Sequence, residues 1–219
     1  MVTAPSAAGK ASKAIMEMGR PEILALILAA SFAAGLNVYA TVATLGLLAR
    51  FEVLQLPASL AMMDNWWVIG AAGLMFVVEF FADKVPAFDM IWNALHTFVR
   101  VPAAAVMAYA AAAPFSGSEQ ILSAVVGGSV AMAAHGGKMA ARAAVTPSPE
   151  PVSNIGLSLL EDALAIGLVW FAVNYPYVAA AIALALVVLA VLLVRWVWKA
   201  LRNLFRGARR ELHELQRAG

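Results

Sequence analysis

The sequence contains no cysteine among its 219 residues. This absence excludes disulfide bonds, metal sites built from thiolates, and cysteine nucleophiles. Charged residues are also scarce, at 13%, whereas 63% of the residues are hydrophobic and the mean hydropathy is +0.83. A soluble domain of this size cannot bury so much apolar side chain. The composition therefore indicates an integral membrane protein without a separate soluble domain.

Apolar blocks long enough to cross a membrane follow one another along most of the chain. They fall at about 22–50, 65–83, 89–113, 119–145, 155–174 and 176–198. Turn-forming residues separate the blocks, and roughly twenty apolar residues suffice for one crossing. We therefore predict an all-α integral membrane protein with six transmembrane helices over residues 21–198. A cytoplasmic segment (1–20) precedes this region, and an amphipathic cytoplasmic tail helix (199–219) follows it.

Two of the blocks are interrupted near the middle by flexible or polar residues. Residues 35–37 (Gly-Leu-Asn) interrupt the first block, and residues 135–138 (His-Gly-Gly-Lys) interrupt the fourth. Because an open backbone turn leaves amide groups unsatisfied in hydrocarbon, such breaks persist only in packed protein or beside a polar cavity. The halves 21–113 and 119–198 each hold one broken block followed by two unbroken blocks. We therefore predict two inverted three-helix repeats, an arrangement typical of transporters.

The same breaks allow a second interpretation, in which each broken block is a re-entrant hairpin and only four helices cross. We favour six crossings because the acidic end of the second block then shares one side with Glu161. Basic residues also concentrate on that side, in the tail after Arg195 and at Lys84 and Lys138, whereas Arg50 is the basic residue of the opposite side. The positive-inside rule then predicts that both termini are cytoplasmic.

Ionisable and amide side chains recur inside the apolar blocks at helical spacing. A charge near the middle of a membrane costs at least about 2.5–3.5 kcal/mol, so such groups pair, bind an ion or face water. The candidate ion- or substrate-binding residues are Asn37, Glu79, Asp83, Asp89, His96, Arg100, His135, Lys138, Arg142, Asn154, Glu161 and Asp162. We expect them to surround an aqueous cavity that opens inward. Salt bridges that only hold the helices together are the alternative.

Several polar motifs occur together in this chain. They are the segments 35–41, 79–86 and 135–138, with Asp89, Trp92, His96, Ser153, Asn154, Glu161 and Asp162. This combination, over about residues 22–195, resembles the bacterial multipass membrane proteins of domain-of-unknown-function family 4126. The resemblance implies the same architecture and a place in the bacterial inner (plasma) membrane. It supplies no activity, so no residue role is carried over.

The leading functional hypothesis is a small secondary transporter or exchanger that uses intramembrane carboxylates. Glu79 and Glu161 are the predicted ligands for a cation or proton, in a cavity between the two repeats. Carboxylate oxygens suit hard cations, so a divalent cation bound by Glu79, Asp83 and Glu161 is the cofactor to test. The basic residues of the same set equally permit an anionic small molecule.

Two alternatives belong to other functional classes. One is an enzyme or flippase that acts on a lipid phosphate, although no constellation of a nucleophile and its base supports an enzyme. The other is a non-catalytic scaffold subunit of a membrane complex. The tail has an apolar and a basic face, which suits contact with the lipid bilayer and also allows a homo-oligomer or protein partner. The net charge of +2 lies in flanking segments, so we expect no nucleic-acid partner.

Overall fold

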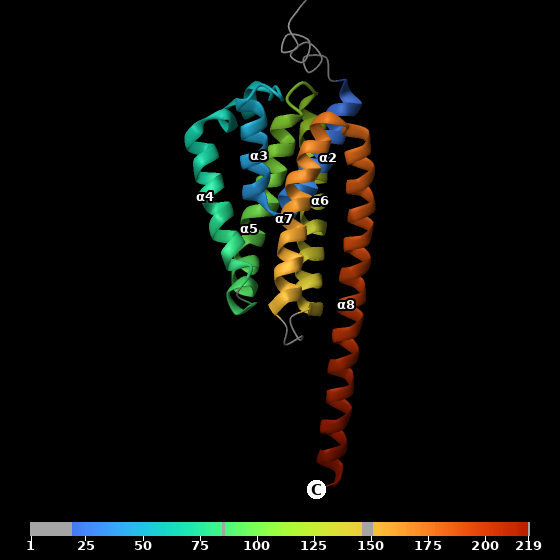
Figure 1. The fold of residues 1–219 in the computed structure, drawn as a ribbon. Coiled ribbons are helices and arrows are strands. Elements are labelled where there is room, and N and C mark those ends of the chain that lie inside the picture. The colour runs from blue at the N-terminus through green and yellow to red at the C-terminus, as the bar shows by residue number, and fades with distance from the viewer. Residues whose placement is uncertain (1–18, 85, 146–150, 219) are drawn as a thin grey trace, which may run out of the picture.

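The computed structural model describes residues 19–84, 86–145 and 151–218, and every regular element in these ranges is a helix. The elements are α2 (Arg20–Leu36), α3 (Val38–Arg50), the 3-10 helix η1 (Ala58–Asp64), α4 (Trp66–Ala82), α5 (Pro86–Ala111), α6 (Gly117–Val145), α7 (Pro151–Asn174) and α8 (Pro176–Ala218). The helices α4 to α8 run along a single bundle in alternating directions, with α2 and α3 in its upper part (Figure 1). The predicted all-α class is confirmed.

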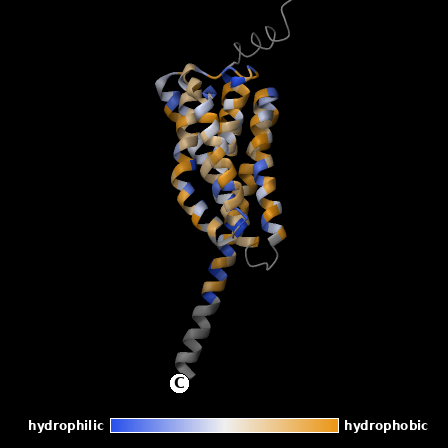
Figure 2. Ribbon diagram, turned by 60° about the vertical axis from the view of Figure 1, so that its left-hand side comes forward, coloured by the Kyte–Doolittle hydropathy of each residue, from blue (hydrophilic) through white to orange (hydrophobic). Residues whose placement is uncertain are grey.

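The outside of the bundle is apolar over most of its length (Figure 2). Leu74 on α4, Val106 on α5 and Leu184 on α8 are large hydrophobic side chains that are each more than half exposed. Within the described ranges, three helical stretches are long and apolar enough to cross a membrane: Ile91–Ala111, Val152–Asn174 and Pro176–Arg206. The pair η1 and α4, bent by 66° at a short break, passes the same test as one unit. An apolar exterior of this extent is compatible with lipid rather than water, and identifies a membrane protein.

The first apolar block folds back on itself instead of passing from one end of the bundle to the other. Arg20, at the start of α2, donates to Glu119 at the start of α6 over 3.2 Å. Ser59, in η1, which follows α3, donates to the carbonyl of Ala110 at the end of α5 over 2.8 Å. A short loop joins the end of α5 to the start of α6, so both ends of the α2–α3 segment lie at one end of the bundle (Figure 1). We call this segment, Arg20–Arg50, the hairpin.

Asn37 separates the two arms of the hairpin. Its backbone is extended, with φ −150° and ψ 100°, and its N–H closes α2 by donating to the carbonyl of Ala33 over 2.9 Å. Its side-chain oxygen then accepts from the N–H of Ala40 over 2.9 Å and caps the start of α3. Asparagine is one of the residues preferred at this capping position. The predicted break at residues 35–37 is therefore confirmed.

The hairpin changes the predicted topology. The structure agrees with the re-entrant interpretation of the first block and not with the six crossings that we favoured. The start of α2 and the end of α8 lie at opposite ends of the bundle (Figure 1), and the location of the two termini in the cytoplasm stays a prediction. The predicted tail is also not a separate element, because α8 is one helix from Pro176 to Ala218.

The predicted break at residues 135–138 is wrong, because α6 is helical from Gly117 to Val145. Glycine inside a helix costs about 1 kcal/mol relative to alanine, which made a break plausible from the sequence. In the structure, a Cβ atom on Gly137 would lie 2.6 Å from the Cβ of Ala190 on α8. The missing side chain lets α8 approach α6 closely. With only one of the two halves broken, the inverted repeats are not confirmed.

Labelling of single cysteines distinguishes the two topologies, since the chain has no cysteine of its own. Arg20→Cys and Glu52→Cys are expected to react with a membrane-impermeant maleimide from the same side of sealed vesicles, because both ends of the hairpin lie together. Arg206→Cys is expected to react from the other side. Reaction of Arg20→Cys from the same side as Arg206→Cys would contradict the hairpin and support a first block that crosses the membrane.

Candidate functional site

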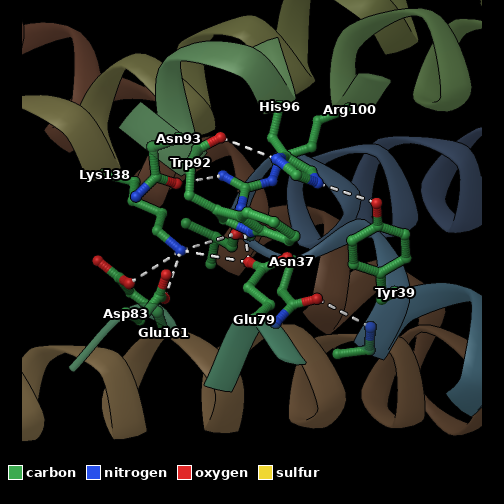
Figure 3. Close-up of polar contacts among 12 residues, drawn as sticks. Asn37, Tyr39, Glu79, Asp83, Trp92, Asn93, His96, Arg100, Lys138 and Glu161 are labelled. Atoms are coloured by element: carbon green, nitrogen blue, oxygen red, sulfur yellow. Dashed lines mark hydrogen bonds and ion pairs between the residues drawn. The ribbon is translucent and has the colours of Figure 1, made fainter. Parts of the chain in front are cut away.

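Polar side chains meet inside the bundle at the level of Asn37 (Figure 3). We call the following connected and buried residues the charge cluster: Asn37, Glu79, Asp83, Asn93, Arg100, His135, Lys138, Arg142, Glu161 and Asp162. Each is at most 6% exposed, although four different helices and the hairpin break supply them. Residues from distant parts of the sequence are therefore brought together, and all of them except Asn93 were predicted as site residues.

Arg100 lies on α5 with no exposed surface. Its Nη2 atom is 2.5 Å from Oε1 of Glu79 on α4, and its Nη1 atom donates to Oδ1 of Asn93 over 2.8 Å. Nη1 also lies 3.0 Å from Nδ1 of His135 on α6. A charge-assisted contact this short, in a site without water contact, ties α4 and α5 together. Arg100 is therefore the counter-charge of Glu79 in this structure.

The ammonium group of Lys138 lies among the three carboxylates that were predicted as metal ligands. Its Nζ atom is 2.9 Å from Asp83, 3.4 Å from Glu161 and 3.5 Å from Glu79. It also lies 3.5 Å from the carbonyl of Leu36, at the end of α2, where helix carbonyls have no partner in the helix. Lys138 thus occupies the place where a cation would sit. Among the described residues, no group of three His, Asp or Glu side chains is arranged to hold a metal ion.

Arg142 lies one helical turn beyond Lys138 on α6. Its Nη2 atom is 2.7 Å from Glu161 and 3.2 Å from the carboxylate of Asp83. Its Nη1 atom donates to the main-chain carbonyl of Asp83 over 3.0 Å, at the C-terminal end of α4. A cation at this place is favourable because the carbonyl groups of the last turn carry partial negative charge. Arg142 therefore links α4, α6 and α7.

Asp162 lies at the hairpin break. Its Oδ1 atom accepts from the side-chain amide of Asn37 over 2.9 Å, and its Oδ2 atom is buried without a hydrogen-bond partner. Among the described residues, no basic side chain forms an ion pair with Asp162, which distinguishes it from the other three carboxylates. Lys84, two residues after the end of α4, donates to the carbonyl of Phe80 over 2.7 Å and attracts Asp162 only through a longer-range electrostatic interaction.

The contacts of His135 determine which of its ring nitrogens carries the proton. Arg100 can only donate, so Nδ1 of His135 accepts, and Nε2 carries the proton. Nε2 then donates to Oγ1 of Thr97 over 2.7 Å, and the hydroxyl of Thr97 donates to the carbonyl of Asn93 over 3.2 Å. The geometry fits a neutral His135 ring held in a single orientation.

His96 belongs to a separate group beside the charge cluster. Its Nδ1 atom lies 2.8 Å from the carbonyl of Trp92, and its Nε2 atom lies 2.9 Å from the hydroxyl of Tyr39 on α3. The ring also stacks on Trp92, with the centroids 4.2 Å apart. The carbonyl can only accept, so in the neutral ring Nε2 accepts from Tyr39. This contact fastens α3 to α5.

The remaining predicted residues are placed as follows. Asn154 on α7 is buried, and its Oδ1 atom has no hydrogen-bond partner in the structure. The side chain of Asp89 lies outside the described residues. Tyr39 and Thr97 were missed because hydroxyl groups are common in membrane helices. The position of Tyr39, two residues after the break, is a signal that could have identified it.

A protein-family model matches residues 24–196 of the chain. Its description is a domain of unknown function, DUF4126. The chain belongs to this family. The matched region of DUF4126 contains the hairpin from residue 24 onward and every residue of the charge cluster, and the resemblance inferred from the polar motifs is confirmed. No curated protein and no solved structure matches the chain.

Proposed function

We propose that the protein is a secondary transporter or exchanger that binds a proton or a cation at Asp162. The charge balance of the cluster supports this proposal. Four carboxylates, those of Glu79, Asp83, Glu161 and Asp162, lie near three buried basic groups, those of Arg100, Lys138 and Arg142. Lys84, which is only half-buried, attracts Asp162 electrostatically but forms no ion pair with it. The first three carboxylates have basic partners within 3.5 Å, whereas Asp162 has the neutral amide of Asn37.

A fourth negative charge without an ion-pair partner is expensive in a buried site. Burial of an uncompensated carboxylate costs several kcal/mol, and the group is neutralised by a proton or a cation instead. The Oδ2 atom of Asp162 has no hydrogen-bond partner, so it is the atom at which that proton or cation would bind. The charge taken up there is exchangeable, in contrast to the charges held in the ion pairs.

The hairpin break supports the same position. In transporters, helices interrupted near the middle of the membrane commonly form the binding site, because their ends offer unpaired backbone groups and partial charges. Here the break residue Asn37 both begins α3 and donates to Asp162. Binding of a proton or cation at Asp162 would alter its hydrogen bond with Asn37, which holds the break in place. Binding would therefore be coupled to the position of the hairpin.

Transport requires that the cluster become accessible, and in this structure its members are enclosed. We propose that the hairpin moves against α7, since Asn37 and Asp162 form the contact between them. The predicted inward-opening aqueous cavity belongs to this opened state and stays a prediction. The proposal no longer needs two inverted repeats, because one hairpin within the bundle supplies the break.

Asp162→Asn is expected to lower ion flux into proteoliposomes at least tenfold, because the amide cannot exchange a proton or hold a cation. The assay applies a panel of cations with and without a pH gradient. Asp64→Asn, an exposed residue at the end of η1, is the matched control and is expected to transport normally. Because Asn keeps the shape of Asp and the contact to Asn37, the folded fraction is expected to stay unchanged. Normal flux in Asp162→Asn would exclude this carboxylate as the coupling site.

The closed ion pairs also favour a second candidate, a scaffold subunit in which the cluster only locks the helices together. Under that hypothesis, no cation or pH gradient produces flux with the native chain, and Asp162→Asn changes thermal stability alone. The lipid-phosphate hypothesis loses its basis, since Arg100, Lys138 and Arg142 are all bound to carboxylates. The flux assay therefore decides between a transporter and a scaffold.

A further inference from the structure

A cavity of about 370 Å³ lies between the two arms of the hairpin, away from the charge cluster. The arms meet at Asn37 and diverge toward the end of the bundle where α2 begins and α3 ends (Figure 1). Two diverging helices leave a wedge that neighbouring elements must fill. The segment after α3 inserts Leu54, which is 3% exposed, and the end of α5 closes the remaining side. The filling is incomplete, and the cavity is the part left over.

The walls of this cavity are apolar. Ile27 of α2, Leu45 of α3, Leu60 of η1, and Met107 and Ala111 of α5 are among the lining residues. The lining includes no charged side chain. Apolar cavities of this kind disfavour water and bind hydrocarbon, and the volume lies within the range of ligand pockets, roughly 300–1,000 Å³.

Polar groups occur only at the two ends of the cavity. Ser31 is buried at its inner end, and Gln55 lies at its rim, where it is exposed. Ser31 precedes Asn37 by six residues, a distance of roughly 9 Å along α2. The cavity therefore approaches the charge cluster but remains separate from it.

A lipid-facing groove adjoins the cavity. It is lined by Leu24, Leu122 and Val126, which are 42–62% exposed on the outer surface of α2 and α6. Ile27 lines both this groove and the cavity, and it packs in a buried cluster with Ala108, Ala112 and Phe115. The groove therefore brings lipid chains close to the cavity, next to Ile27.

We propose that the cavity binds one hydrocarbon chain between the arms of the hairpin, with the polar end of the ligand at the rim near Gln55. The chain comes either from a phospholipid of the bilayer or from a free single-chain amphiphile such as a fatty alcohol. This inference does not depend on transport at Asp162. It gives the hairpin a ligand that fills the wedge and holds its arms apart.

Photocrosslinking in vesicles tests the proposal in two parallel experiments. The first uses a phospholipid that carries a diazirine on one acyl chain, and the second uses a fatty alcohol that carries a diazirine. Mass spectrometry then locates the adducts in the full chain. Adducts are expected on the cavity-lining parts of residues 20–36 and 51–60, and an excess of the unlabelled compound is expected to reduce them. Adducts with the phospholipid identify the bilayer as the source, and adducts with the alcohol alone identify a free amphiphile.

Ala111→Phe is expected to fill the cavity and lower these adducts at least fivefold, while adducts on the lipid-facing side of α8 stay unchanged. Ala185→Phe adds the same ring on the exposed surface of α8 and is the matched control. If Ala111→Phe fails to fold, Ala30→Leu reduces the cavity from the side of α2. Adducts spread evenly over the lipid-facing helices, with none in the cavity, would overturn the proposal.

Discussion

Arg100→Leu is expected to destabilise the protein by about 3–5 kcal/mol, the range measured when one partner of a buried ion pair is removed. Both Arg100 and Glu79 have no exposed surface, and they lie 2.5 Å apart. Without the guanidinium, Glu79 retains only the more distant ammonium of Lys138, at 3.5 Å. Asn93 and His135 lose their charged donor as well. Unfolding in mixed micelles with increasing denaturing detergent measures the loss.

The double variant Glu79→Met, Arg100→Met is the control for this prediction. Removal of both charges leaves neither partner unpaired, and such exchanges are often neutral or even stabilising. The double variant is therefore expected to recover most of the stability that Arg100→Leu loses. Equal losses in the single and double variants would show that packing volume, and not the charge pair, is what Arg100 contributes.

Gly35→Ala is expected to destabilise the protein by about 1–3 kcal/mol or more, although it adds a single methyl group. A Cβ atom at this position would lie 2.4 Å from the carbonyl oxygen of Ala131 and 2.7 Å from the Cβ of Ala134 on α6. The first of these is a backbone atom in the middle of a helix, so α2 and α6 would have to move apart. The same unfolding assay measures the effect.

Gly73→Ala on α4 provides a control with the opposite expected sign. No atom lies within 4 Å of a Cβ built at Gly73, so the methyl group meets open space on the lipid-facing side. Alanine in a helix is favoured over glycine by roughly 0.5–1 kcal/mol, so a neutral or slightly stabilised protein is expected. A loss in Gly73→Ala as large as that in Gly35→Ala would refute the steric explanation.

Burial of the polar residues was predictable from the sequence, and the direction of the chain was not. Exposure of an ionisable side chain to lipid is costly, so an ionisable residue in an apolar block is expected to be buried beside an opposite charge. Whether a break turns the chain back depends on the dihedral angles of one residue, Asn37, and on what the arms pack against. The break at Gly136 and Gly137 failed as a prediction because glycine serves close packing as well as flexibility.

Burial also weakens the argument for the orientation in the membrane, which stays a prediction. Lys138 was counted as a basic residue that marks the cytoplasmic side, and Arg142 lies one turn beyond it on α6. In the structure they are buried and neutralised by Asp83 and Glu161, so they carry no information about the side of the membrane. Arg20 and Arg50, which were assigned to opposite sides, are the first residue of α2 and the last residue of α3, and these two helix ends lie at the same end of the bundle (Figure 1).

The length of α8 has a mechanical consequence. At 43 residues the helix is roughly 65 Å long, about twice the hydrocarbon thickness of a bilayer. Its upper part is held against α6 where Ala190 meets Gly137, and its lower part extends beyond the bundle (Figure 1). A stiff rod held at one end acts as a lever. A tilt of about 10° at that contact would displace the far tip by about 7 Å, since the helix from Ala190 to Ala218 is roughly 42 Å long.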